Sequence, residues 1–206
     1  MHFVSSLFAL AAVFLLVHAN PWDTRAAEST KCYTTHTGYF EIIDHPFGLS
    51  KDHHVVYPAT TAAPKFKVHF QRCPQLTRYG KAEPFIYWGR ILVEESAAVK
   101  ANQCLTTTPS STPRILYAKL ADCGSETNPA AAQSWSYLDE DFGKVISFAG
   151  QDKCTYRSGS ISGYIVDPKS KDGFEPLTTK DTHLVKIGCD DVPDRGVGYF
   201  TLSGLN

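Results

Sequence analysis

Short apolar stretches separated by turn-forming residues run through most of this chain. In residues 65–70 the apolar positions alternate, with Phe66, Val68 and Phe70 on one face and polar or charged side chains on the other. This period of two is typical of a half-buried β-strand. Clusters of Gly, Pro, Ser and Thr separate the stretches at the intervals of an all-β domain. The predicted strands are residues 39–43, 54–57, 66–70, 85–88, 90–93, 115–120, 134–138, 144–148, 164–166, 184–187 and 198–202.

The first residues of the chain form a different pattern. From Phe3 to Val17 the sequence is almost entirely apolar, but this run is shorter than the about 20 residues of a membrane span. It ends with small residues at the positions that a signal peptidase reads, the second of them Ala19. A buried N-terminal helix is the alternative. The predicted organisation is a signal peptide over residues 1–19, a flexible leader over 20–31 and one domain over 32–206, which makes the mature protein secreted and extracellular, without membrane insertion.

The position and the number of the cysteines agree with a secreted protein. All 6 cysteines lie beyond the predicted cleavage point, and an even number in an oxidising compartment predicts disulfide bonds. A zinc site is the alternative, but it needs pairs of cysteines separated by two to four residues, and the sequence has none.

The sequence contains a threefold repeat built around these cysteines. KFKVHFQRC followed by PFIYWGRIL, RILYAKLADC followed by QSWSYL, and THLVKIGC followed by GYFTL align with one another. The same number of residues separates Cys73 from Phe85 and Cys123 from Trp135. The repeat divides the domain into units at about residues 32–88, 89–142 and 143–206.

One such unit, with about 50 residues, is too small to close its own hydrophobic core. Three units can meet around a pseudo-threefold axis if each contributes an aromatic side chain from its last strand, namely Phe85, Trp135 and Tyr199. We expect a disulfide within each unit to join its second strand to its third. The expected pairs are Cys32–Cys73, Cys104–Cys123 and Cys154–Cys189.

The middle unit resembles a repeat of the ricin-type lectins. It has a Cys-Leu start at Cys104, a second cysteine at Cys123 and a Q-x-W ending at Gln133 and Trp135. The resemblance implies a β-trefoil fold, in which Gln133 and Trp135 belong to the structural core. It also implies carbohydrate binding.

The sugar-binding residues of that family are not matched. Where its repeats carry Asp, two places after the first cysteine, this chain has Thr34, Thr106 and Tyr156. Where they carry an aromatic residue, two places before the second cysteine, it has Gln71, Ala121 and Ile187, and the Asn expected before the Q-x-W glutamine is Ala132. Any sugar recognition must therefore use other loops.

No catalytic motif is found, and we expect no catalytic site, metal or cofactor. His53 and His54 could suggest a metal or acid–base cluster, but adjacent strand residues point to opposite faces. Glu94–Glu95 and the acidic run 139–141 could supply the paired carboxylates of a glycosidase, although contiguous acids are typical of a solvated loop. The formal charge of −1 offers no footprint for nucleic acid.

Two loops are candidates for function. Residues 106–113 are rich in Thr, Ser and Pro, and are either a solvated turn or a site of O-glycosylation. Residues 167–182 lengthen the third unit and carry Phe174, either exposed for binding or folded back on the barrel. Tyr156, Phe174 and Asn128 are the candidate ligand-binding residues.

The predicted function is non-enzymatic recognition of a glycan or glycoprotein outside the cell. The alternative is a protein-binding module, such as a protease inhibitor or a secreted host-interaction protein. A hydrolase that uses the acidic loops is the third hypothesis.

Overall fold

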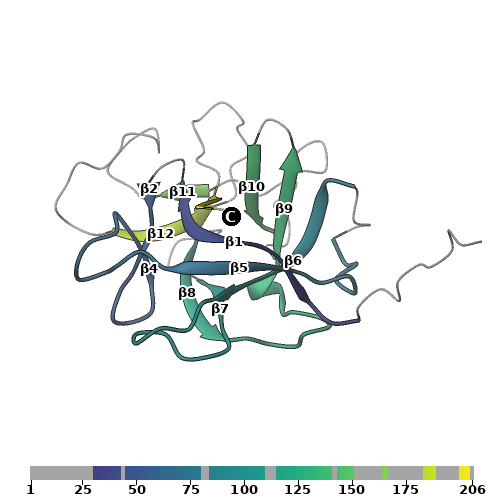
Figure 1. The fold of residues 1–206 in the computed structure, drawn as a ribbon, viewed down its shortest axis with the longest axis horizontal. Coiled ribbons are helices and arrows are strands. Elements are labelled where there is room, and N and C mark those ends of the chain that lie inside the picture. Colours follow the sequence, from purple (N-terminus) through teal and green to yellow (C-terminus); the bar gives the residue numbers. More distant parts are fainter. Residues whose placement is uncertain are drawn as a thin grey trace, which may run out of the picture.

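The structure, a computed structural model, describes residues 30–42, 45–79, 84–109, 115–140, 143–150, 164–166, 183–188 and 200–204. In these residues the fold is all-β, with one short 3-10 helix, η1, over Ala131–Gln133 (Figure 1). The strands are β1 (Tyr33–Ile42), β2 (His45–Pro46), β3 (Gly48–Leu49), β4 (Val55–Tyr57), β5 (Lys67–Arg72), β6 (Ile86–Val93), β7 (Gln103–Pro109), β8 (Ile115–Asp122), β9 (Trp135–Glu140), β10 (Gly143–Phe148), β11 (Tyr164–Val166), β12 (His183–Gly188) and β13 (Thr201–Ser203).

Strand β6 runs through the predicted boundary between the first two units. Residues 85–88 and 90–93 were expected to be separate strands, with the boundary between residues 88 and 89, but Ile86–Val93 is continuous. Gly89 is present because β5 approaches closely: a Cβ atom there would lie 2.0 Å from the carbonyl oxygen of Gln71. The glycine therefore marks a close backbone contact inside a strand rather than a turn.

Two other segments differ from the sequence pattern. Thr106–Pro109, expected in a solvated loop, continues strand β7 and pairs with β8. The stretch 94–103 is the best helical candidate in the sequence, with a single short turn at most, but the structure has no helix there; Ser96 and Val99 form an isolated bridge instead. In Thr106–Pro109, pairing with the neighbouring strand β8 overrides local preference.

Six strands pair with one another to form a curled sheet. Antiparallel pairs join β1 to β5, β5 to β6, β6 to β9 and β9 to β10, while β13 pairs with the other edge of β1. Ile146 of β10 forms a bridge with Phe200, directly before β13, and donates its backbone N–H to the Phe200 carbonyl at 2.7 Å. The pairings thus return to their starting strand (Figure 1).

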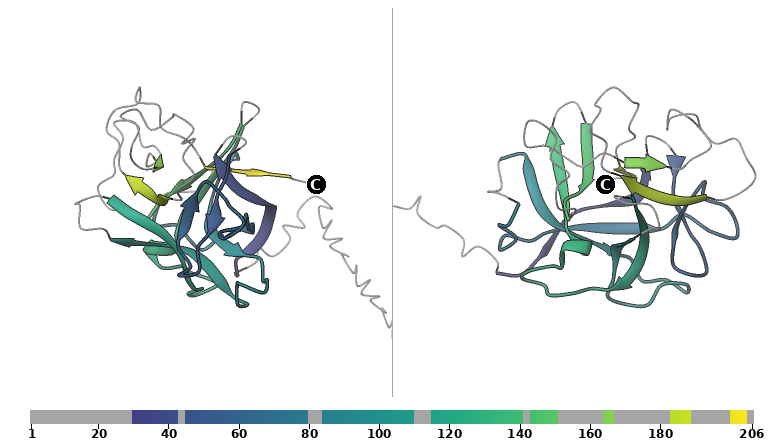
Figure 2. Two further views of the ribbon diagram at one scale, coloured as in Figure 1. Left: turned by 90° about the vertical axis from the view of Figure 1, so that its left-hand side faces the viewer. Right: turned by 180° about the vertical axis from the view of Figure 1, so that it is seen from behind.

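Three hairpins connect these six strands. The hairpin β3–β4 lies between β1 and β5 in the chain, β7–β8 between β6 and β9, and β11–β12 between β10 and β13. Because β1, β6 and β10 run in the same direction around the antiparallel circuit, all three hairpins begin at the same end. There β12 pairs with both β8 and β4, and His54 bridges to Lys119 of β8 (Figure 2).

Aromatic rings fill the core. Trp135 is fully buried and donates its indole N–H to the carbonyl of Leu105 at 3.2 Å. Its ring meets Phe148 at 5.2 Å, Phe200 at 6.1 Å and Phe40 at 6.4 Å between centroids, all at steep angles. Such edge-to-face contacts add to the stabilisation from burial alone.

The core position expected for Phe85 is wrong. Its side chain is 42% exposed, because it lies in the turn before β6. Within the same predicted unit, Phe70 of strand β5 is fully buried and contributes to the core instead. Tyr199 lies outside the described residues, and the neighbouring Phe200 is the buried aromatic there.

Two disulfides are present in the described part of the chain. Cys104–Cys123 joins β7 to the residue after β8, across 19 positions in the sequence. Cys32–Cys73 joins the residue before β1 to the residue after β5, across 41 positions. The pairing of Cys32 with Cys73 is as predicted. The bond was expected to join the second and third strands of its unit, but it connects the first and last strands of the segment, β1 and β5. Cys154 and Cys189 lie outside the described residues.

Acid is expected to destabilise the fold through His54, which lies where two hairpins meet. Burial lowers the pKa of His54 from its ordinary value of 6.5, Lys119 lowers it further, and Asp52 opposes both. The unfolded chain then binds the proton more readily than the folded chain, so the free energy of unfolding falls as the pH drops through and below 6.5. Urea titrations between pH 8 and pH 5 measure this slope.

The variant His54→Gln cannot take up the proton and should lose part of the slope. Lys51→Ala, an exposed change on the same hairpin, should keep it. Equal slopes in His54→Gln and the unaltered protein would contradict the assignment.

Candidate functional site

The Q-x-W glutamine is an internal connector. Gln133 is buried, and its Nε2 donates to the Thr106 hydroxyl at 2.8 Å and to the Asp122 carbonyl at 2.9 Å. Its Oε1 accepts the backbone N–H of Gly124 at 2.8 Å. Gln133 therefore joins β7, the end of β8 and the start of the following loop.

Thr106 occupies the position at which the resembled lectins carry a sugar-binding Asp. Its side chain is buried, accepts from Gln133 and donates to the Cys104 carbonyl at 3.2 Å. The Thr106 hydroxyl thus makes its hydrogen bonds to other groups of the protein.

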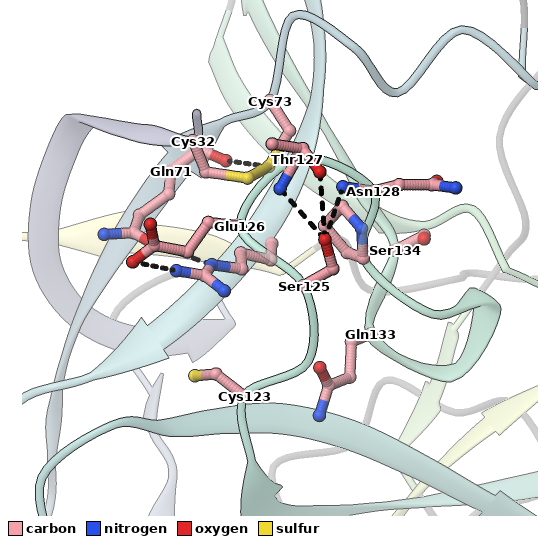
Figure 3. The surroundings of a disulfide bond; sticks show 12 residues. Cys32, Gln71, Cys73, Cys123, Ser125, Glu126, Thr127, Asn128, Gln133 and Ser134 are labelled. Carbon is pink, nitrogen blue, oxygen red and sulfur yellow. Dashed lines mark hydrogen bonds and ion pairs between the residues drawn. A yellow bond between two sulfur atoms is a disulfide. The ribbon is translucent and has the colours of Figure 1, made fainter. Parts of the chain in front are cut away.

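An exposed loop follows the Cys104–Cys123 disulfide, and we refer to residues 124–130 as the clamped loop. Its first half is ordered by Ser125, whose hydroxyl accepts the backbone N–H groups of Thr127 and Asn128, both at 3.2 Å (Figure 3). The Ser125 hydroxyl also lies 3.0 Å from that of Thr127. This turn gives the exposed residues a defined backbone conformation.

Glu126 attaches the clamped loop to the two residues that precede strand β1. Its backbone carbonyl accepts the N–H of Cys32 at 2.7 Å, and its carboxylate lies 3.1 Å from Lys31 Nζ. The hydrogen bond and charge of Lys31 lower the pKa of Glu126, with a smaller contribution from Arg90. The carboxylate is therefore ionised at neutral pH.

The buried side chain of Arg90 contacts the same loop at Gly124 and Glu126. This side chain is only 3% exposed and donates to the Gly124 carbonyl at 3.1 Å and to Gln71 Oε1 at 2.8 Å. Its guanidinium lies 3.9 Å from the Glu126 carboxylate. Although burial lowers the pKa of Arg90, a guanidinium stays protonated in proteins. The buried charge thus has both hydrogen-bond acceptors and a counter-ion.

Arg78 holds the far end of the clamped loop. It donates to the Pro129 carbonyl and to the Ser134 hydroxyl, the latter at 2.7 Å. Ser134 in turn donates to the Ala130 carbonyl at 2.9 Å. The loop is therefore fastened at its start, its middle and its end.

Asn128 is the candidate ligand-binding residue that the structure describes. Its backbone is fixed by Ser125, while its side chain is exposed and points away from the Cys32–Cys73 disulfide (Figure 3). Within the described part of the chain, its amide group has no hydrogen-bond partner. Tyr156 and Phe174 lie outside the described residues.

Sequence reasoning missed the arginines that form the clamp. A signal existed for Arg90, because a charged residue inside the apolar run IYWGRILV must find partners when the strand is buried. Nothing in the local sequence of Arg78 indicates that it reaches Pro129 and Ser134, which lie more than 50 positions away.

The histidines and carboxylates weighed for chemistry are dispersed. Among the described residues, no group of three or more His, Cys, Asp or Glu side chains is placed to hold a metal. Glu94 lies 3.7 Å from His69, and Asp139, in strand β9 rather than a loop, lies 3.6 Å from His36. These two carboxylates thus each face a histidine.

A scan against protein-family models finds no match, and no curated protein matches the chain. In the described part of the chain, no helix is both long and apolar enough to cross a membrane.

Proposed function

We propose that this protein is a secreted, non-enzymatic recognition protein with a β-trefoil fold. The pairing circuit supports the fold, because residues 33–72, 86–140 and 143–203 each supply two of its six strands and one of the three hairpins. Contact of every hairpin with the other two supports a pseudo-threefold arrangement.

Secretion is supported by two features. The two disulfides are typical of oxidising compartments, and the sequence begins with a signal-peptide pattern.

The partner that the geometry favours is an extracellular protein, bound through the clamped loop. The carrying observation is that residues 124–128 are exposed while their backbone is fixed by Ser125, Arg90 and Cys32. A preorganised loop loses little conformational entropy on binding. A secreted protease is the first partner to test, since an exposed rigid loop suits an enzyme cleft.

The experiment compares the mature protein with Asn128→Ala against a panel of secreted serine, cysteine and aspartic proteases and a glycan array. We expect inhibition or binding of at least one protease, weakened about tenfold in the variant, as for a central contact worth about 1.4 kcal/mol. Glu95→Ala, another exposed polar change, is the control. Binding to glycans alone, or to no member of either panel, would contradict the proposal, as would protease binding that Asn128→Ala leaves unchanged.

A further inference from the structure

The strand register gathers a second set of side chains at the end of the circuit opposite the hairpins. Tyr87 lies directly opposite Tyr137 in the β6–β9 pair, and Lys144 opposite Asp139 in the β9–β10 pair. Since alternate residues of a strand share one face, Tyr137 and Asp139 point to the same side. We refer to His36, Arg72, Tyr87, Tyr137 and Asp139 as the base cluster.

Contacts within two groups of these side chains, together with the Tyr87–Tyr137 register, place all five on one face. The His36 ring stacks on Tyr137 with centroids 4.1 Å apart, and His36 Nε2 lies 3.6 Å from the Asp139 carboxylate. The Arg72 guanidinium lies 4.8 Å from the centre of the Tyr87 ring. Five strands of the circuit thus converge here, Lys144 included.

The base cluster holds two hydrogen-bond donors that find no acceptor among the described residues. Tyr137 is fully buried, and its hydroxyl has no hydrogen-bond partner there. Burial raises the pKa of Tyr137, so the hydroxyl keeps its proton and can donate. The buried Nε of Arg72 has no partner in the same set of residues. Because buried polar groups of this kind normally have an acceptor, both donors are suited to the oxygen atoms of a ligand.

The charges of the base cluster are unequally matched. Asp139 faces His36 and lies opposite Lys144. Arg72 has the ring of Tyr87 as its contact, and no carboxylate in the described part of the chain pairs with it. Among the side chains that the structure describes, the unmatched charge is therefore positive, which favours an anionic ligand.

Two exposed aromatic rings border the same end. Tyr33 lies directly opposite Arg72 in the β1–β5 pair and is 39% exposed. Phe85 is 42% exposed, and its carbonyl accepts the N–H of Asp139 at 2.9 Å. Flat apolar rings beside polar donors suit a ligand that has both an apolar face and oxygen acceptors.

We propose that the base cluster binds a sugar that carries a carboxylate, such as a uronic or sialic acid residue. Arg72 is the direct donor to the carboxylate, and the Tyr137 hydroxyl is the deeper donor, reached directly or through one water. The sugar ring lies against Tyr33. This site is separate from the clamped loop and does not depend on the partner proposed there.

The test is calorimetric titration of the full mature protein with trigalacturonate, with N-acetylneuraminate and with neutral galactotriose. We expect one of the acidic sugars to bind at least tenfold more tightly than galactotriose. Arg72→Met should weaken that binding at least tenfold. Tyr137→Phe should weaken it about threefold to fivefold and leave the melting temperature unchanged or higher, since the lost hydroxyl has no partner among the described residues.

Two control variants test whether binding is specific to the base cluster. Lys65→Met removes an exposed positive charge elsewhere and should leave binding unchanged, as should Asn128→Ala in the clamped loop. Equal binding of acidic and neutral sugars, no binding of either acid, or equal losses in Arg72→Met and Lys65→Met would overturn the proposal. Loss of binding in Asn128→Ala would move the sugar to the clamped loop and would also overturn it.

Discussion

Replacing Trp135 by alanine is expected to lower the free energy of unfolding by about 3–5 kcal/mol, the range for a large aromatic side chain removed from a core. Trp135 is fully buried and contacts Phe40, Phe148 and Phe200, which come from three different strands or strand ends. These neighbours are held by their own strand pairings and cannot collapse fully into the space. Urea denaturation followed by circular dichroism measures the loss.

Two comparisons make this expectation specific. Trp135→Phe keeps most of the apolar volume but loses the hydrogen bond to the Leu105 carbonyl, so its loss should be clearly smaller. Leu184→Ala removes a side chain that is 39% exposed and should change stability by less than about 1 kcal/mol. A loss below about 1 kcal/mol for Trp135→Ala would show that this ring does not support the core.

The variant Cys32→Ser with Cys73→Ser is expected to lose about 4 kcal/mol, because the bond closes a 41-residue separation and restricts the unfolded chain. Cys104→Ser with Cys123→Ser should lose about 3 kcal/mol, since its separation is 19 residues. Denaturation under matched non-reducing conditions measures both variants.

The Cys32–Cys73 disulfide also affects the clamped loop, which is the proposed site of partner binding. Cys32 donates its N–H to Glu126 in the clamped loop, and Lys31 pairs with the same residue. Removing the bond releases Cys32 from Cys73, while Tyr33 stays paired with Arg72 of β5. The contact of Cys32 with Glu126, one of the three attachments of the loop, should therefore weaken. Under the proposed function, partner binding should weaken at temperatures where the variant is still folded. Undiminished binding would show that Arg90 and Arg78 suffice to hold the loop.

Much of the β architecture could be predicted from local pattern. The alternation in residues 65–70 and the turn residues between stretches located most strands to within a few residues. The cysteine repeat predicted both disulfides that the structure describes. These features are encoded locally, by side-chain period, or by cysteine spacing, which constrains distant pairs directly.

The failures have a common physical cause. Gly89 was expected to separate two strands, because glycine often interrupts a strand, whereas here it lies within β6 and admits the Gln71 carbonyl of a neighbouring strand. Phe85 was placed in the core by its spacing from a cysteine, but its exposure depends on where β6 begins. Arg78 was not noticed at all. Each outcome depends on a neighbour that is distant in the sequence.

By itself, the sequence determined that this chain forms short strands, that cysteines close its segments and that Gln133 and Trp135 have structural positions. Only the tertiary structure decided that Thr106 is used inside the protein, that two arginines fasten residues 124–130, and that Arg72 and Tyr137 share one end of the circuit. Periodicity fixes which face of a strand is apolar, but strand pairing decides which side chains meet across that face. A binding site consists of side chains from different strands that lie close together, and it therefore forms only when the strands have paired.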